Sequence, residues 1–292
     1  MDDGRAADLV GIVTGANSGI GKATATELAA RGMKLFVTCR TLAKGRPVVE
    51  EIRENTGNAA VEPLKLELGD FDSVRRCAAE FLDRDLPLNL LINNAGVGVQ
   101  RGLTPSGFEL AFGTNHLGPF LLTGLLLERL IESAPSRVVV VSSVGHHSAK
   151  GIDFEAVRRS TKSRSGSNEY YTSKLANVLF SAELARRLEG SGVSTYALHP
   201  GIVATEVWRR FPRPLTWLAK RFMLSPEDGA KTSVHCAIAP ELEEESGLYY
   251  DGCMVKETSD LARDEALARK LWEHSEAWVD YEYPAPTGSA TG

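Results

Sequence analysis

The sequence lacks the cysteine and histidine patterns that mark disulfide-rich and metal-binding proteins. Its four cysteines are far apart and form no C-x-x-C pair. We interpret them as free thiols in a reducing compartment. The six histidines form neither an H-x-x-x-H nor an H-E-x-x-H motif. We therefore expect no metal site.

Long hydrophobic runs and an excess of basic charge are also missing. The longest apolar run, residues 119–127, is interrupted by Thr123 and Gly124 and is too short to span a bilayer. Residues 1–5 are polar and contain no apolar signal core. The formal net charge is −5, whereas nucleic-acid-binding proteins are commonly basic. We expect a cytoplasmic protein with no stable membrane span and no nucleic-acid partner.

Short apolar runs alternate with amphipathic segments along the 292 residues. Strands are predicted at residues 9–13, 34–39, 60–68, 88–92, 137–143, 193–198 and 247–250. Helices are predicted at residues 22–31, 48–55, 72–81, 108–132, 170–188 and 259–280, and another begins after Ser225. This order predicts an α/β fold, a doubly wound (Rossmann-type) parallel sheet with helices on both faces. Without a linker or repeat, we expect one domain, residues 1–283, and a flexible tail, residues 284–292.

A glycine-rich turn, Thr14-Gly-Ala-Asn-Ser-Gly-Ile-Gly21, joins the first predicted strand to a helix. Glycines let a backbone approach a pyrophosphate closely, and the N-terminus of the following helix presents free N–H groups to an anion. The spacing differs from G-x-G-x-x-G, and a purely structural turn is the alternative. Its position between a strand and a helix favours nucleotide binding.

The end of the second predicted strand bears on which nucleotide is bound. Folds that bind NAD usually carry an acidic residue there for the ribose hydroxyls. This chain has Cys39 and Arg40 instead, with Lys44 close by. Because an arginine can pair with a 2′-phosphate, Arg40 favours NADP(H). A solvated arginine at a strand end is the alternative.

The stretch from Asn168 to Asn177 begins a predicted helix and contains Tyr170 and Lys174. Residues four apart lie on one helix face, so the phenol and the ammonium can point into the same space. A cation beside a phenol brings the phenol pKa down from about 10, toward the range that general acid–base catalysis needs. Taken alone, the pair would be read as an amphipathic helix face. The cofactor motif gives it weight.

Jointly, these motifs resemble the classical short-chain dehydrogenase/reductase family over all but the tail. They stand in the family's order: Thr14-Gly15-x-x-x-Gly19-x-Gly21, Asn93-Asn94-Ala95-Gly96, Asn115, Ser143, Tyr170-x-x-x-Lys174 and Pro200-Gly201. Residues 14–22, 114–120, 173–180 and 199–201 are similar to the retinol dehydrogenase-like branch. That branch commonly has an N-terminal membrane anchor, whereas residues 1–5 here are polar.

The resemblance implies a site for NADP(H). It places the following residues around the pyrophosphate: Gly15, Ser18, Gly19, Ile20 and Gly21. It places Arg40 at the 2′-phosphate. The residues that it places beside the adenine and the adenosine are Glu67, Leu68, Asn93 and Gly96. Glu67 stands where the family has Asp. The nicotinamide would be contacted by Pro200, Ile202 and Thr205, and Tyr170 and Lys174 would also contact the cofactor.

The catalytic set implied by the resemblance is Asn115, Ser143, Tyr170 and Lys174. Tyr170 would donate a proton to the substrate oxygen, and Ser143 would hydrogen-bond the same oxygen. Lys174 would lower the Tyr170 pKa and hold the nicotinamide ribose, and Asn115 would fix a water that relays protons. Ser142 is also available, but the family pattern points to Ser143. A strand-end hydroxyl that serves only the backbone is the alternative for Ser143.

The residues at 203–224 are rich in aromatic and apolar side chains, including Trp208, Phe211, Trp217 and Phe222. We expect this segment to be a lid over a lipophilic ketone, aldehyde or alcohol. Core packing is the alternative for any single residue. Basic pairs at 209–210 and 220–221 leave membrane contact open.

Three functions are compatible with these patterns. The favoured one is an NADP(H)-dependent oxidoreductase. The second is a catalytically silent NADP(H)-binding regulatory or scaffold protein, which the complete catalytic set disfavours. The third is a sugar-nucleotide epimerase or dehydratase, which the glycine spacing and modest length disfavour. Family members often associate through the helices that contain Asn115 and Tyr170, so a homodimer or homotetramer is also an expectation.

Overall fold

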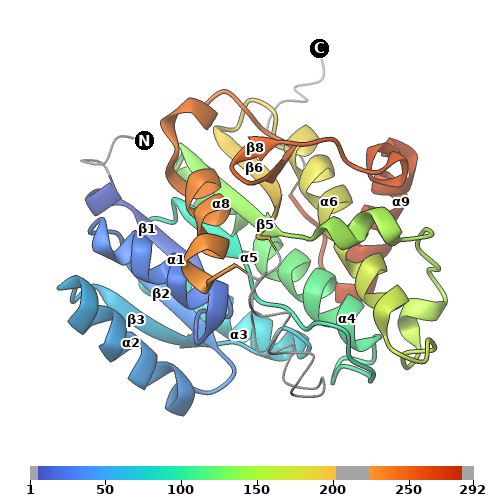
Figure 1. Cartoon of the computed structure of the whole chain (residues 1–292), viewed down its shortest axis with the longest axis horizontal. Helices are drawn as coiled ribbons and strands as arrows, with labels where there is room; N and C mark the ends of the chain where they lie inside the picture. Colours follow the sequence, from blue (N-terminus) through green and yellow to red (C-terminus); the bar gives the residue numbers. More distant parts are fainter. Residues whose placement is uncertain (1–5, 202–223, 285–292) are drawn as a thin grey trace.

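A computed structural model describes residues 6–201 and 224–284 of the chain. In this part of the chain, eight strands form a single sheet in the order β3-β2-β1-β4-β5-β6-β7-β8 (Figure 1). Every neighbouring pair is parallel except β7 and β8. The predicted doubly wound parallel sheet is confirmed.

The strands begin and end close to the predicted limits. Their bounds are β1 Val10–Val13, β2 Lys34–Cys39, β3 Val61–Lys65, β4 Leu90–Asn93, β5 Ser136–Val141, β6 Val193–His199, β7 Leu248–Asp251 and β8 Met254–Val255. β3 is shorter than predicted. It is also an edge strand, which explains why it tolerates Pro63. β8 has two residues, too few to leave a pattern in the sequence.

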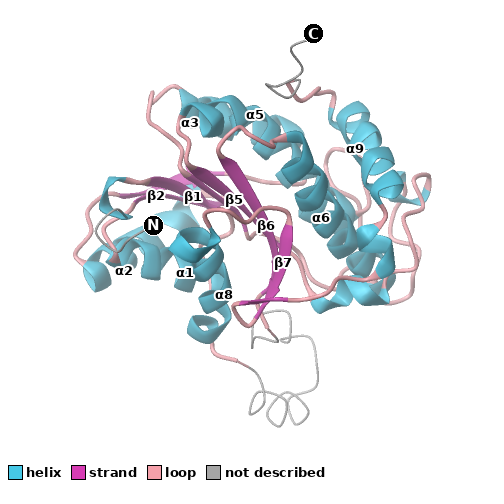
Figure 2. Cartoon of the chain, turned by 90° about the horizontal axis from the view of Figure 1, so that it is seen from above, coloured by secondary structure: helices cyan, strands magenta, loops and turns pink. Residues whose placement is uncertain are grey.

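Helices cover both faces of the sheet (Figure 2). One face carries α1 (Gly19–Ala30), α2 (Leu42–Thr56) and α8 (Pro226–Ile238). The other carries α3 (Phe71–Leu82), α5 (Gly118–Glu132), α6 (Ser167–Arg187) and α9 (Glu265–Val279). In β5, alternate valines enter the two cores, since Val138 and Val140 join one and Val139 and Val141 join the other. The continuous apolar run of this strand therefore serves two hydrophobic layers.

The predicted helix at residues 108–132 has three parts. It starts as α4 (Leu110–Phe112), passes through a π-helical turn (Gly113–Leu117) and continues as α5. By length and composition, the stretch Leu110–Glu132 could cross a membrane, with a mean hydropathy of 1.3, but 89% of its most apolar window is buried inside the protein. This burial makes it a core helix of the fold.

The prediction of one continuous helix over residues 259–280 is wrong. A short 3-10 helix, η7 (Asp260–Arg263), ends before α9 begins. Ser259 caps the first piece, as predicted, by accepting a hydrogen bond from Ala262 N. Asp264 has an extended backbone and caps the second by accepting from Leu267 N. A second N-cap residue inside the amphipathic pattern therefore restarts the helix.

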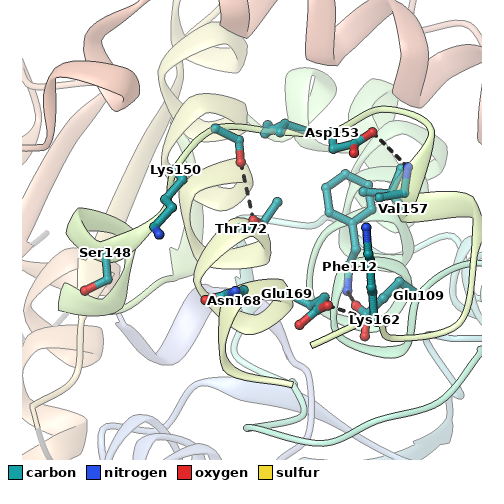
Figure 3. Close-up of a pocket in the computed structure, with 13 residues that line it drawn as sticks. Glu109, Phe112, Ser148, Lys150, Asp153, Val157, Lys162, Asn168, Glu169 and Thr172 are labelled. Carbon is teal, nitrogen blue, oxygen red and sulfur yellow. Dashed lines mark hydrogen bonds between the residues drawn. The ribbon is translucent and has the colours of Figure 1, made fainter. Parts of the chain in front are cut away.

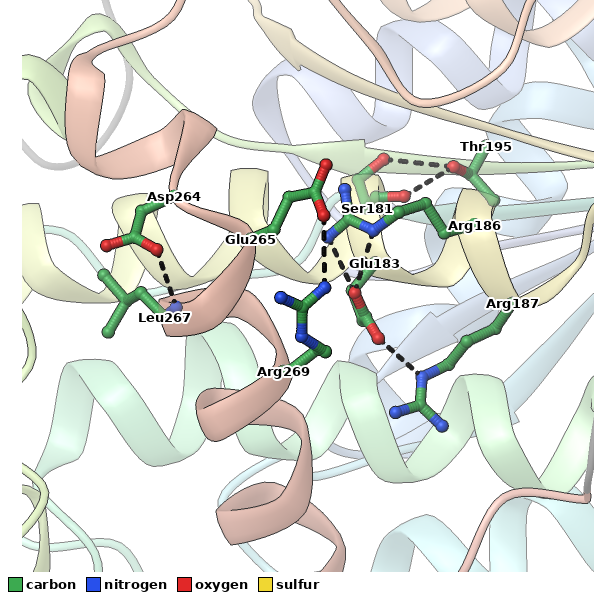
Figure 4. Close-up of polar contacts among 9 residues, drawn as sticks. All are labelled: Ser181, Glu183, Arg186, Arg187, Thr195, Asp264, Glu265, Leu267 and Arg269. Atoms are coloured by element: carbon green, nitrogen blue, oxygen red, sulfur yellow. Dashed lines mark hydrogen bonds and ion pairs between the residues drawn. The ribbon is translucent and has the colours of Figure 1, made fainter.

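Helix α9 packs on α5 and α6 of the same chain. Its Trp272 is buried, with ring centroids 5.0 Å from Phe120 of α5 and 5.9 Å from Phe180 of α6. Figure 4 shows α9 beside α6, where Glu183 pairs with Arg186 and Arg187. Part of the surface of α5 and α6, which the expected dimer or tetramer would use, is thus covered by α9. The oligomeric state stays a prediction.

Candidate active site

The sheet has a topological switch point between β1 and β4, where ligands bind in doubly wound folds. The turns that follow these two strands are tied together through Thr14. Its hydroxyl donates to Ile92 O (3.2 Å) and accepts from Asn94 N (3.0 Å) and Ala95 N (2.9 Å). Asn94 Nδ2 donates in return to Thr14 O (2.7 Å). Thr14 and Asn94 hold the two turns together. Neither residue was given a role from the sequence, although both belong to the motifs quoted there.

The glycine turn fits the pyrophosphate of a dinucleotide. Gly15 and Gly19 have positive φ, of 65° and 56°. A Cβ on Gly21 would lie 2.3 Å from Asn94 Nδ2, so the close approach of the two turns needs glycine there. α1 begins at Gly19, and within the described part of the chain its N-cap Ser18 makes no side-chain cap hydrogen bond. The N–H groups of the first turn, including that of Ile20, are therefore open to an anion.

The predicted 2′-phosphate and adenine residues follow the ends of β2 and β3. Arg40 is exposed and makes no ion pair with the residues at 6–201 and 224–284. Glu67 is half-buried, and its N–H donates to Ser73 Oγ (3.0 Å). Leu68 buries its side chain in the core, which leaves only its backbone for a ligand.

Asn93 and Gly96 lie on the β4 side of the crevice. Asn93 Nδ2 donates to Thr123 Oγ1 of α5 (2.9 Å), which supports the sheet, and its buried Oδ1 has no partner among the described residues. A Cβ on Gly96 would lie 3.0 Å from Asn115 Oδ1 and 3.8 Å from Lys174 Nζ. Pro200 directly follows β6. The other predicted nicotinamide contacts, Ile202 and Thr205, and all of the predicted lid but Leu224, lie outside the described residues.

Helix α6 places Tyr170 and Lys174 on one face, as predicted. Lys174 Nζ lies 5.7 Å from the centroid of the Tyr170 ring and donates to Val141 O of β5 (3.0 Å). Asn177, one turn further on, donates to the same carbonyl (3.2 Å). Burial lowers the pKa of Lys174 to about 8. Lys174 therefore loses its proton at a pH much closer to neutral than an ordinary lysine does.

The pKa of Tyr170 shifts in the opposite direction to the one we expected. Burial raises it, a hydrogen bond with Ser143 opposes the rise, and Tyr171 adds slightly to it. Lys174 is not among the groups that shift it, and its ammonium donates to Val141 O while lying 5.7 Å from the centroid of the phenol ring. In the chain by itself, Tyr170 therefore holds its proton more firmly than a free phenol does.

The two adjacent serines have different partners. Ser142 Oγ is buried and donates to Lys174 O (2.7 Å), so it serves the α6 backbone. Ser143 is half-buried, accepts from Gly145 N (3.1 Å) and lies near enough to the Tyr170 phenol to lower its pKa. The side chain that faces the phenol is that of Ser143, as the sequence motif predicted.

The side chain of Asn115 is engaged on all sides. Its Oδ1 accepts from Val97 N (2.7 Å), and its Nδ2 donates to Val97 O (3.0 Å) and to Ser173 Oγ (3.0 Å). These bonds clamp the loop after β4 onto α6. The expected role of Asn115 in holding a relay water stays a prediction.

Comparison with known proteins identifies the family. A family model described as short chain dehydrogenase matches residues 10–214. Retinol dehydrogenase 11 from Homo sapiens is 49% identical over 267 residues, covering 90% of this chain and 83% of that protein. Retinol dehydrogenase 13 from Homo sapiens is 43% identical over 286 residues, covering 94% and 85%. The chain belongs to the short-chain dehydrogenase family, in the retinol dehydrogenase-like branch.

Solved structures agree with this assignment. A crystal structure of an uncharacterised protein from Mycobacterium paratuberculosis is 34% identical, with a TM-score of 0.75 and coverage of 96% of this chain and 98% of that one. The NADP complex of RhlG from Pseudomonas aeruginosa shares the fold, with 24% identity, a TM-score of 0.67 and coverage of 84% and 94%. As a short-chain dehydrogenase, the protein is an oxidoreductase of a family that uses NAD(P)(H).

A cavity of about 440 Å³ in this short-chain dehydrogenase lies beside α6 (Figure 3), and its lining residues do not include Tyr170. Asn168, Glu169 and Thr172 line it, and Thr172 is two residues from both Tyr170 and Lys174. Two residues correspond to about 200° around a helix. The cavity therefore lies on the opposite side of α6 from the proposed chemistry. Among the described residues no group of three His, Cys, Asp or Glu side chains could hold a metal ion.

Substitution of Lys174 by methionine is expected to stabilise the protein at neutral pH. Burial lowers the pKa of Lys174 from 10.5 to about 8, so the buried ammonium costs the folded state about 3 kcal/mol at 1.36 kcal/mol per pKa unit. Methionine has a similar shape, and Asn177 still donates to Val141 O. Lys174→Met should therefore raise the free energy of unfolding at pH 7 by about that amount.

The way the free energy of unfolding changes with pH tests whether the buried Lys174 charge is what destabilises the wild-type protein. Between about 8 and 10.5, the unfolded chain still binds a proton at Lys174 while the folded chain does not, so wild-type stability rises with pH. Urea unfolding should show the two proteins converging above that window. Lys231→Met, at an exposed lysine, is the control and should show no such convergence. A variant less stable than wild type at pH 7 would show that the ammonium does not destabilise the fold.

Proposed function

We propose that the protein is an NADP(H)-dependent oxidoreductase that interconverts a lipophilic ketone or aldehyde and its alcohol, with Tyr170 as general acid and base. The convergence of Ser143, Tyr170 and Lys174 at the carboxyl end of β5 carries this proposal. The similar proteins named retinol dehydrogenases support it, because retinol is a lipophilic alcohol.

When bound, NADPH would supply the hydride for the carbonyl carbon. Tyr170 is protonated at neutral pH, as an ordinary phenol is, and burial raises its pKa further. The phenol can therefore donate its proton as negative charge develops on the substrate oxygen. Ser143 hydrogen-bonds the same oxygen. Lys174, with a pKa of about 8, lies 5.7 Å from the centroid of the ring and can return a proton to Tyr170 after each turnover. In alcohol oxidation these groups exchange roles.

Exposed apolar side chains stand in segments that follow the carboxyl ends of β4, β5 and β7, which supports a lipophilic substrate. Val99 and Leu103 follow β4, and Val144 follows Ser143. Met254 and Val255 follow the end of β7 and are 57% and 50% exposed. All of these segments begin at carboxyl ends of parallel strands, so a substrate would approach the catalytic groups past an apolar rim.

Arg40→Ala is expected to remove a preference for NADPH. Arg40 is exposed at the carboxyl end of β2 and has no described ion pair to break. A charge-assisted hydrogen bond contributes about 1.5–3 kcal/mol, so kcat/KM for NADPH should fall about 10- to 100-fold while that for NADH changes little. Steady-state kinetics with both cofactors measures this. Arg269→Ala, on the remote α9, is the control. An unchanged NADPH to NADH ratio in Arg40→Ala would rule out this arginine as the selector.

The proposed function is tested by following NADPH oxidation with retinal, a steroid ketone, an aliphatic aldehyde and an aromatic aldehyde. NADH is tested in parallel, and the corresponding alcohols are tested with NADP⁺. We expect turnover with NADPH and lipophilic carbonyls. NADPH binding without turnover in either direction would favour the catalytically silent scaffold protein. Turnover of nucleotide sugars would favour the epimerase or dehydratase.

A further inference from the structure

The backbone carbonyl of Ser143 is held by a histidine three residues further along. His146 lies in a short 3-10 helix, η3 (Val144–Ser148), that begins directly after Ser143. Its backbone N–H donates to Ser143 O (3.1 Å), and its ring Nδ1 lies 2.7 Å from the same oxygen. Its other ring nitrogen, Nε2, accepts from the N–H of Ser259 (3.3 Å). One imidazole thus joins the end of β5 to the segment that leads into η7 and α9.

The chemistry of the two partners fixes the protonation state of this ring. A backbone carbonyl can only accept, so Nδ1 must carry a hydrogen and donate it. A backbone N–H can only donate, so Nε2 must be free of hydrogen and accept. Only the neutral Nδ1–H tautomer of His146 satisfies both. Adding a proton at Nε2 would bring two donors face to face at Ser259.

The surroundings of His146 favour the same neutral state. The side chain is fully buried, with ring centroids 4.0 Å from His147 and 4.9 Å from Tyr249 of β7. Burial lowers its pKa, the Ser143 carbonyl opposes the shift, and His147 and His199 of β6 add to it. No carboxylate faces the ring among the interactions of the described residues that shift its pKa. The imidazole is therefore held neutral by its packing as well as by its partners.

We propose that His146 is a positioning residue for Ser143, holding the serine backbone so that its hydroxyl faces Tyr170. This inference rests on the function proposed above, in which Ser143 binds the substrate oxygen. The hydroxyl of Ser143 must accept a hydrogen bond from Gly145 N and must also lie beside the phenol of Tyr170. Both contacts depend on where the chain turns after β5. A displacement of about 1 Å at such a group can cost about 10²-fold in rate.

The matched test compares His146→Phe, His146→Asn and the neighbour His147→Asn. Phenylalanine keeps the ring shape but loses the two hydrogen bonds of the imidazole ring, to Ser143 O and from Ser259 N. Asparagine can place an N–H donor where Nδ1 stands, so it loses only the bond from Ser259. We expect kcat to fall about 10- to 100-fold in His146→Phe, with KM for NADPH unchanged, and to recover at least tenfold in His146→Asn. His147→Asn should keep wild-type kcat. Equal loss in both His146 variants, or no loss in either, would overturn the proposal.

A double-mutant cycle with Ser143→Ala separates positioning from a general structural effect. If His146 acts through Ser143, His146→Phe should slow single-turnover NADPH oxidation in the wild-type background and add less than about twofold in the Ser143→Ala background. Equal fold losses in both backgrounds would show a role independent of Ser143. Wild-type activity in Ser143→Ala itself would instead refute the proposed function of that serine, whatever His146 does.

Discussion

Tyr170→Phe is expected to lower kcat for carbonyl reduction by about 10²- to 10⁴-fold, the usual contribution of a positioned acid or base. The phenol is half-buried, lies beside Ser143 and is backed by the Lys174 ammonium 5.7 Å from its ring centroid. Phenylalanine keeps the ring and its contacts but cannot donate a proton. NADPH affinity, measured by fluorescence titration, should stay within about threefold, because the variant changes the chemical step and leaves the glycine turn intact.

Tyr171→Phe is the matched control for this prediction. The two tyrosines are adjacent, with ring centroids 6.0 Å apart, but four residues after Tyr171 stands Leu175 and not a lysine. The control should keep most of its kcat. If Tyr170→Phe retained wild-type turnover, or if Tyr171→Phe lost as much, the proton donor would have to be another group.

The second large effect concerns stability. Trp272→Ala should lower the free energy of unfolding by about 3–5 kcal/mol, the usual cost of truncating a large buried aromatic side chain. The Trp272 ring is 2% exposed and fills the space between α9 and its neighbours, with centroids 5.0 Å from Phe120 and 4.5 Å from Tyr283. The Arg187 guanidinium lies 4.3 Å from the ring centroid. Urea unfolding, followed by circular dichroism, measures the loss.

Trp278→Ala offers a comparison on the same helix. Trp278 is only half-buried, so its truncation should cost clearly less than that of Trp272. Equal costs at the two positions would mean that α9 is not anchored mainly through Trp272. A negligible cost at Trp272 would mean that α9 contributes little to the stability of the α5 and α6 layer.

The sheet and the position of the site could be predicted because they depend on local patterns. The alternation of apolar runs with amphipathic segments predicted the doubly wound parallel sheet, and the four-residue spacing predicted that Tyr170 and Lys174 share one helix face. The glycines of the first turn predicted a tight turn, and Gly15 and Gly19 adopt positive φ there.

What could not be predicted depends on contacts between distant residues. The upward direction of the Tyr170 pKa shift is set by burial, which outweighs the opposing effect of Ser143. The Lys174 ammonium donates to the carbonyl of Val141, on a different element of the fold. The spacing of residues along a helix does not show which group the ammonium at the end of a flexible lysine side chain will contact. Likewise, His146 and Ser259 are 113 residues apart, so the hydrogen bond between them becomes visible only in the folded chain.

The most direct test of hydride transfer uses NADPH deuterated on the transferable position of its nicotinamide ring, with retinal as the carbonyl. Wild-type protein should give an alcohol that carries one deuterium on the former carbonyl carbon, detected by mass spectrometry, and Tyr170→Phe should give almost none in the same time. If the wild-type protein binds NADPH and yet no deuterium reaches retinal or any other carbonyl substrate, the oxidoreductase mechanism proposed for this site is contradicted.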